Sequence, residues 1–70
     1  MTQVHPLVAQ LHETRLRLGI TQVDLAARVG VNPATIVNLE RGHRGPHLFT
    51  AECIANALGL ELKLVPKDER

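Results

Sequence analysis

Several residue types that support catalysis or reinforce small proteins are scarce or missing in this 70-residue chain. It has a single cysteine, Cys53, so no disulfide can form within the chain. It has no serine, tyrosine or tryptophan and no glycine-rich phosphate loop before a helix, so a serine nucleophile and a nucleotide-binding loop are both unavailable. Since a domain this small also has little room for a deep pocket, we expect no enzymatic activity.

Long apolar runs are also missing. No run approaches the roughly 18 apolar residues of a membrane span, and the charged residues and proline among the first twenty positions do not fit a secretory signal. A length of 70 residues with 44% apolar content suits one small domain over residues 1–70. We therefore expect a cytoplasmic, single-domain protein without membrane contact.

Charge of one sign is not in excess either. The net charge of +1, from eight basic and seven acidic residues, is too small to indicate nucleic-acid binding by itself. Residues 41–47, however, contain two arginines and two histidines and no acid, so a basic surface is expected only locally. Six of the eight basic residues are arginine, whose planar guanidinium suits bidentate bonds to phosphates and bases.

The four histidines (His5, His12, His43 and His47) do not form a recognisable metal motif. A zinc site needs converging ligands, usually including thiolates, and Cys53 is the only thiol. We interpret Cys53 as a small buried or half-buried side chain and not as a reactive thiol. We expect no metal and no cofactor.

Capping residues, glycines and apolar spacing predict four short helices in the first sixty residues. The predicted boundaries are Pro6 to Gly19, Thr21 to Gly30, Asn32 to Glu40 or Arg41, and a fourth helix through Ala51, Ile54, Ala55 and Leu58 that stops at Gly59. In the first helix, Leu7, Leu11 and Leu18 fall at helical spacing, with Val8 beside them. The fold class is therefore all-α.

The spacing of the apolar residues changes after Gly59, from a helical period to alternation. Leu60, Leu62 and Leu64 alternate with other residues, which predicts a half-buried strand over residues 60–65. A strand needs a ladder partner for its backbone groups, either residues 2–4 or the same strand of a second molecule. We expect the second arrangement, with the three leucines as the dimer contact.

Residues 21–41 have the features of a helix-turn-helix. Ala26 is small where the two helices would cross, and Gly30 can adopt the positive φ of the tight turn. Val29, Ile36 and Leu39 supply a shared apolar seam. Each feature is weak alone, but together they favour this motif.

The stretches RLRLGITQVDLAARVGVNPATIVNLERG and PHLFTAECIANALG resemble the phage-repressor (Cro/CI, XRE) family over residues 11–59. The resemblance implies a compact, lambda-repressor-like domain of four or five helices that binds operator DNA with its third helix in the major groove. The family more often has a fifth helix where this chain has LELKLVP, a strand like that of some antitoxins. Residues 49–52 also depart from the family's leucine-rich fourth helix.

The resemblance also implies roles for individual residues. The expected base contacts come from Asn32, Pro33, Ala34, Thr35 and Asn38, and the expected phosphate contacts from Gln22, Arg41, His43 and Arg44. Asparagine can make a bidentate contact to adenine, threonine can bond either base edge, and alanine can touch a thymine methyl. Arg15 and Glu40 match a structural ion pair of the family. These residues also have interpretations without DNA contact: Asn32 as a helix cap, Gln22 as a helix-start residue and residues 41–44 as a solvated loop.

The sequence thus favours a transcriptional repressor that binds a two-fold symmetric operator as a homodimer and has no evident small-molecule effector site. The alternative is an antitoxin-type interaction module that neutralises a partner toxin and represses its own operon. The two functions are compatible, because antitoxins of this kind bind operator DNA as well.

Overall fold

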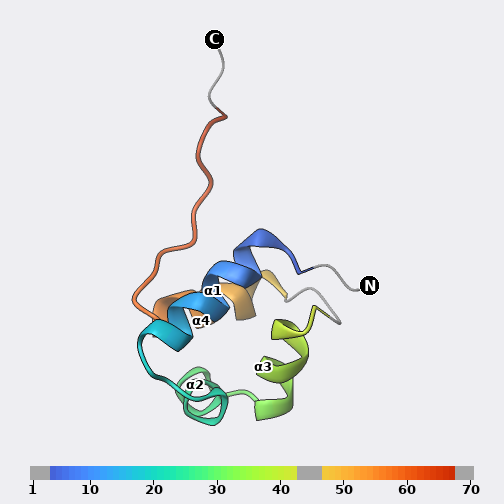
Figure 1. Ribbon diagram of the computed structural model, residues 1–70. Helices are drawn as coiled ribbons and strands as arrows, with labels where there is room; N and C mark the ends of the chain where they lie inside the picture. The colour runs from blue at the N-terminus through green and yellow to red at the C-terminus, as the bar shows by residue number, and fades with distance from the viewer. Residues whose placement is uncertain (1–3, 43–46, 68–70) are drawn as a thin grey trace.

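The computed structural model describes residues 4–42 and 47–67, within which the chain forms four α-helices (Figure 1). They are α1 (Pro6–Arg17), α2 (Gln22–Val29), α3 (Pro33–Glu40) and α4 (Leu48–Ala57). The all-α prediction is confirmed, and α4 begins three residues before the apolar pattern at Ala51 from which it was predicted. No fifth helix follows α4 in the described residues.

Side-chain caps set the starts of three helices. The Thr21 hydroxyl accepts a hydrogen bond from the Asp24 backbone N–H at 3.0 Å, and the Asn32 side-chain oxygen accepts one from Ala34 at 2.8 Å. His5 Nδ1 accepts from the Leu7 backbone N–H at 3.0 Å. Each cap satisfies a backbone donor that has no partner inside its helix, which is worth about 1 kcal/mol.

The core lies where α2 packs against α3 and α4. Leu25, Ile36 and Ile54 are its largest fully buried side chains, one from each of these helices. Ala26 is 1% exposed, and the lack of a long side chain there lets the backbones of neighbouring helices approach. Val8, Ile20, Leu39 and Leu58 complete the cluster of buried apolar side chains.

The buried side of α1 differs from the pattern of its leucines. Leu7 and Leu18 are 49% and 54% exposed, whereas Val8 is buried and Leu11 packs against the core. The helix is rotated so that Arg15, only 7% exposed, points inward. The leucine spacing therefore predicts the helix correctly but does not identify which side of it is buried.

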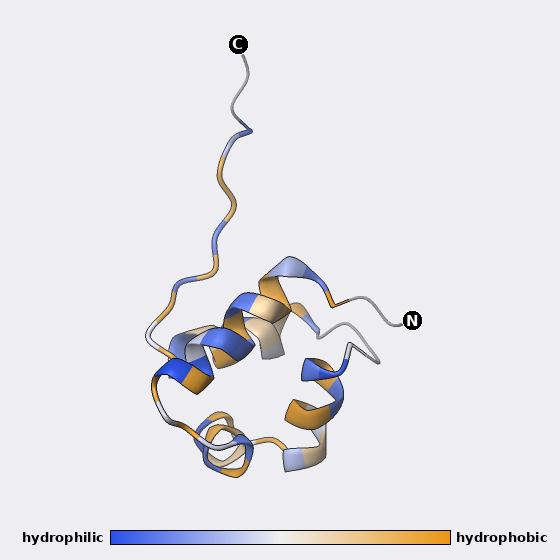
Figure 2. Cartoon of the chain, in the orientation of Figure 1, coloured by the Kyte–Doolittle hydropathy of each residue, from blue (hydrophilic) through white to orange (hydrophobic). Residues whose placement is uncertain are grey.

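The predicted strand over 60–65 does not form in the described part of the chain. After α4 the chain follows an extended path whose far end lies away from the helices, with alternating hydrophobic and hydrophilic residues (Figures 1 and 2). Leu60 and Leu62 are half-buried, but Leu64 is 99% exposed. The reason is the ladder requirement: Val4 is not in a strand, and residues 2 and 3 lie outside the described residues, so this segment has no described partner.

One ion pair connects α1 to the end of α3. Arg15 Nε donates to Glu40 Oε2 at 2.7 Å, and Arg15 Nη2 donates to Glu40 Oε1 at 3.0 Å. The third nitrogen, Nη1, donates to the backbone carbonyl of Ile20 at 2.7 Å. Both side chains are 8% exposed, so the pair is removed from water and each charge depends on the other.

We predict that Arg15→Ala lowers the free energy of unfolding by about 3–5 kcal/mol, because it leaves the Glu40 carboxylate buried without its main partner. Urea denaturation followed by circular dichroism measures this loss. Arg17→Ala, an exposed position on the same helix, is the matched control and should change stability by less than about 0.5 kcal/mol. Equal denaturation midpoints for the two variants would show that the ion pair contributes no stability.

Two further side chains face the same carboxylate. Gln22 Nε2 donates to Glu40 Oε1 at 2.9 Å, and His12 Nδ1 lies 3.0 Å from that oxygen. Burial by itself raises the pKa of Glu40, but hydrogen bonds from Arg15 and Gln22 and the charges of Arg15 and protonated His12 outweigh it. The pKa of Glu40 therefore lies below its ordinary value of 4.5.

This lowered pKa predicts the direction of acid destabilisation. A carboxyl whose pKa is lower in the folded state contributes stability above its unfolded pKa and loses it as the pH falls through the folded pKa. We therefore expect the melting temperature to decrease as the pH falls from about 5 to about 3. Glu40→Gln should show a smaller decrease over this range from a lower starting point, whereas Glu52→Gln, at an exposed position, should behave like the parent. Parallel pH curves for Glu40→Gln and the parent would contradict this.

Candidate nucleic-acid interface

The turn between α2 and α3 fixes how these helices sit relative to each other. The backbone N–H groups of Gly30 and Val31 both donate to the carbonyl of Ala26, at 2.8 and 3.0 Å. This closes α2 with Gly30 at φ 85°, a conformation that glycine adopts without steric cost. Asn32 then begins α3 at once, so the helix-turn-helix predicted for residues 21–41 is present (Figure 1).

The two sides of α3 differ sharply in exposure. Ile36 and Leu39 are buried against the core, and the five residues with predicted base contacts are all exposed: Asn32, Pro33, Ala34, Thr35 and Asn38. They lie at the N-cap and on the first two turns of α3, the part of a recognition helix that approaches base edges. Within the described part of the chain, this face of α3 is therefore not covered by the core.

Asn32 has a structural role in addition to any contact with DNA. Its side-chain oxygen is taken up by the cap of α3, so only its NH₂ group remains available to an acceptor on DNA. The side chains of Thr35 and Asn38 make no hydrogen bond within the described residues. Their donors and acceptors are free for base edges.

Two of the four predicted phosphate-contacting residues lie in the described structure. Gln22 is the first residue of α2 and half-buried, and Arg41 is exposed directly after α3. Because Gln22 is bonded to Glu40 and Arg41 follows Glu40 in the chain, the start of α2 lies beside the end of α3. His43 and Arg44 lie outside the described residues.

The contact with Glu40 orients the Gln22 amide. An ionised carboxylate only accepts hydrogen bonds, so the amide must present Nε2 and not its carbonyl oxygen. One N–H of Nε2 then remains for another acceptor. Gln22 is the first residue of α2, at the helix end where the dipole favours anions.

Sequence reasoning did not identify His12 as part of this site. Its Nδ1 atom is buried and lies 3.0 Å from Glu40 Oε1, yet its geometry does not make a hydrogen bond. Its side chain is 42% exposed. His12 precedes Arg15 by three positions, and residues at this spacing share a helix face. This spacing is the only sequence signal that could have indicated it.

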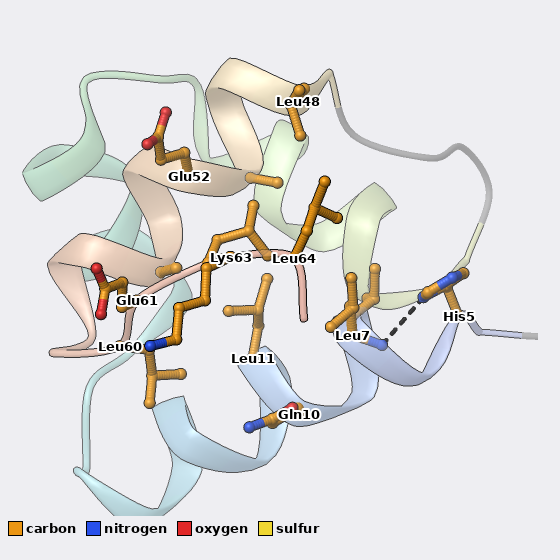
Figure 3. A pocket seen from close by; sticks show the side chains of 14 residues that line it. His5, Leu7, Gln10, Leu11, Leu48, Glu52, Leu60, Glu61, Lys63 and Leu64 are labelled. Atoms are coloured by element: carbon orange, nitrogen blue, oxygen red, sulfur yellow. Dashed lines mark hydrogen bonds between the residues drawn. The ribbon is translucent and has the colours of Figure 1, made fainter. Parts of the chain in front are cut away.

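A second feature missed from the sequence is an apolar groove of about 620 Å³ between α1, α4 and residues 60–64 (Figure 3). Leu7 and Leu11 of α1 and Leu48 of α4 line it, together with the three leucines of the predicted dimer contact, Leu60, Leu62 and Leu64. Leu7 and Leu48 are 49% and 78% exposed. The groove and residues 60–64 therefore form one connected apolar surface, which is unusual for a monomer when it is extensive.

Other site types have little support in residues 4–42 and 47–67. These residues bring together no group of three histidine, cysteine, aspartate or glutamate side chains that could hold a metal ion. Cys53 is half-buried on α4. None of the helices in this part of the chain has the length and apolar character that crossing a membrane requires.

Comparison with known proteins gives relatives of the same kind. The helix-turn-helix family model matches residues 11–65. An uncharacterised HTH-type transcriptional regulator from Methanothermobacter thermautotrophicus is 51% identical over 51 residues, which are 73% of this chain and 74% of the relative. Another from Archaeoglobus fulgidus is 39% identical over 54 residues, 77% of each chain.

Solved structures with this fold include HipB in a complex with an O2 20mer, with a TM-score of 0.79 and 27% identity over 97% of this chain and 99% of HipB. A chain of the HipA–HipB–O2–O3 complex has the same TM-score at 25% identity, covering 97% of this chain and 100% of its own. The restriction-modification controller protein C.Esp1396I has a TM-score of 0.71 at 25% identity, covering 84% and 80%. The chain belongs to the helix-turn-helix family of transcriptional regulators.

Proposed function

We propose that this chain is a cytoplasmic repressor that binds a two-fold symmetric DNA operator as a homodimer and acts by binding, without catalysis. The observation that supports this most directly is the division of α3. Its inner face, at Ile36 and Leu39, belongs to the core, and its outer face presents Thr35 and Asn38 with free polar groups. A rigid helix with one polar face exposed is suited to the major groove.

Base recognition in this proposal depends on few side chains. Asn38 supplies a donor and an acceptor for adenine, Thr35 a hydroxyl for either base edge, and Ala34 a methyl group for thymine. Pro33 has no polar side-chain atom, and the Asn32 oxygen is occupied by the cap. With so few hydrogen-bonding groups, part of the specificity must come from the shape and deformability of the DNA.

Phosphate contacts would hold α3 in position. Gln22 and Arg41 lie at opposite ends of the α2–α3 unit in sequence, but Gln22 is bonded to Glu40 and Arg41 follows Glu40 in the chain. Such contacts fix the register and orientation of the helix on the duplex and contribute no base specificity. His43 and Arg44 follow Arg41 in the sequence and extend the same basic segment.

The homodimer is supported by the apolar surface formed by the groove and residues 60–64. Leu64 is 99% exposed, and Leu62 and Leu60 precede it at alternating positions. Antiparallel pairing of this segment with the same segment of a second copy would complete its backbone hydrogen bonds and cover the leucines. It would also hold two copies of α3 at a fixed separation, which must be near one helical turn, about 34 Å, to contact adjacent half-sites.

A protein partner is a second candidate function, favoured by one comparison. HipB, which shares this fold over nearly its whole length, is assembled with HipA in one of the similar structures. An antitoxin-type role, in which this chain binds a toxin and represses their operon, therefore remains the alternative. Copurification of a stable complex with the product of a neighbouring gene would support it.

We predict that selection from random DNA yields a site with two inverted half-sites about one helical turn apart. On this selected duplex, Asn38→Ala should weaken binding by about 1–3 kcal/mol and have little effect on unrelated DNA, because the lost contact is to a base edge. Arg41→Ala should weaken binding to both duplexes and reduce the salt dependence by about one unit of slope, because the lost contact is to a phosphate.

Fluorescence anisotropy with labelled duplexes separates these effects. Val23→Ala, an exposed change on α2 without a predicted DNA contact, serves as the control and should leave both affinities unchanged. Equal losses on the selected and unrelated duplexes for Asn38→Ala would remove α3 from base recognition.

We also predict that a chain ending at Gly59 is monomeric and binds the selected duplex more weakly, since the second half-site is no longer tethered. A chain ending at Pro66 keeps residues 60–65 and should remain dimeric. Sedimentation equilibrium at micromolar concentration measures both. A Gly59 chain that is still dimeric would place the interface on the helices instead.

A further inference from the structure

We propose that two copies of this chain pair residues 60–64 in a single antiparallel register centred on Leu62, and that Glu61 and Lys63 select a second copy of the same chain as the partner. This inference rests on the homodimer of the proposed function and specifies its contact. It identifies the residue that faces its own copy at the two-fold axis and the ion pairs on either side of that axis.

Symmetry restricts the registers that are available. In an antiparallel pair, residues directly opposite each other point to the same face, whereas successive residues of one strand point to opposite faces. When the two strands are copies related by a two-fold axis perpendicular to the pair, one residue must therefore lie opposite its own copy. Near the middle of residues 60–64 that residue is Glu61, Leu62 or Lys63.

Charge distinguishes these three registers. With Leu62 at the axis, Glu61 of each copy faces Lys63 of the other, which gives two pairs of opposite charge in the dimer. With Glu61 at the axis two carboxylates face each other, and with Lys63 at the axis two ammonium groups do. Opposite charges at facing positions stabilise paired strands and like charges destabilise them. Both side chains belong to exposed residues, so a partner strand can reach them.

The leucines favour the same register. With Leu62 at the axis, Leu60 of each copy faces Leu64 of the other and Leu62 faces itself, so all three leucines are matched. A shift of the axis to either neighbouring residue leaves one leucine of each copy without a facing leucine in residues 60–64. Leu60 packs against the core of its own copy, whereas Leu64 is 99% exposed. The pairing therefore places the most exposed leucine of each copy beside a leucine that is anchored on the core of the other.

Pro66 fits this register as well. Proline has no backbone N–H and interrupts the ladder wherever it is paired. With Leu62 at the axis, Pro66 lies opposite Leu58, which is the C-cap of α4 and precedes the paired segment. With Lys63 at the axis, Pro66 would instead face Leu60 and remove a donor from the ladder.

The order of the charges identifies a second copy as the occupant of this apolar surface. An antiparallel strand that fits residues 60–64 must carry a base opposite Glu61, an apolar residue opposite Leu62 and an acid opposite Lys63. The segment itself meets this requirement when it is read in the opposite direction. The groove of about 620 Å³ that residues 60–64 share with α1 and α4 lies beside it, so pairing would extend the apolar contact beyond the strands.

Charge reversal tests the register and the choice of partner together. Glu61→Lys and Lys63→Glu each make the two facing positions alike in charge, so each variant alone should dimerise about tenfold more weakly than the parent at low salt. A one-to-one mixture of the two variants should recover dimers, because every facing pair then has opposite charges. The double variant, Glu61→Lys with Lys63→Glu, exchanges the charges and should dimerise like the parent.

Sedimentation equilibrium at micromolar concentration measures each protein alone. Fluorescence anisotropy of Glu61→Lys, labelled at its N-terminal amine and titrated with itself or with Lys63→Glu, measures the choice of partner. Glu13→Lys and Lys67→Glu are the matched controls, since they make the same reversals at exposed positions outside residues 60–64. Both should dimerise like the parent, and thermal melting shows that every variant is folded.

Cross-linking reads the register without reference to charge. In a Cys53→Ala background, Glu61→Cys, Leu62→Cys and Lys63→Cys each carry one thiol. Facing residues have Cβ atoms about 4.5–5.5 Å apart, close to the separation that a disulfide requires. On mild oxidation Leu62→Cys should form a covalent dimer faster than the other two, because only position 62 faces its own copy.

The outcomes separate this inference from the proposed function. If the parent is dimeric but either charge reversal dimerises as well as the parent, if the mixture forms no more dimer than its components, or if position 61 or 63 cross-links fastest, the register is overturned and the homodimer stands. A parent that is monomeric by itself, because another protein or its own chain covers residues 60–64, overturns the homodimer and this inference together. Binding of that monomer to the selected duplex would still support DNA recognition by α3.

Discussion

The structure depends on one buried carboxylate. Glu40, at the last turn of α3, accepts hydrogen bonds from Arg15 of α1 and Gln22 of α2, and His12 of α1 stands against it as well. The core of apolar side chains is small, as it must be in 70 residues. The polar contacts at Glu40 therefore help to hold three helices together, a role that additional buried apolar area has in larger domains. It also couples the ends of α2 and α3, where the proposed phosphate contacts lie, to the interior.

Local features of the fold were predictable from the sequence, and non-local ones were not. Thr21, Gly30 and Asn32 determine both ends of α2 and the start of α3 through contacts within a few residues, and a sequence pattern contains that information. The contact of Arg15 with Glu40 spans 25 positions, and only the family resemblance indicated it. The position of His12 at the same carboxylate depends on the rotation of α1, which its leucine spacing left undetermined.

The predicted strand failed for a different physical reason. Residues 60–65 have the alternation of a half-buried strand, but a strand is defined by its hydrogen-bonded neighbour and not by its own sequence. Within the described residues of one chain no neighbour exists. The same segment also lines the apolar groove, together with Leu7 and Leu48. Its alternating leucines therefore belong to an apolar surface that a single copy of the chain leaves uncovered. The exposed site residues of α3 were easier to predict, because their outward direction follows from the buried positions Ile36 and Leu39.

The separation of the two faces of α3 has a consequence for how such domains diversify. Ala34, Thr35 and Asn38 are exposed, and exchanges at exposed positions usually alter stability by about 0.5 kcal/mol or less. New combinations at these positions can therefore accumulate by single mutations while Ile36, Leu39 and the Gly30 turn keep the helix in place. Descendants of such a domain can therefore change which DNA sequence they prefer without passing through a variant that fails to fold.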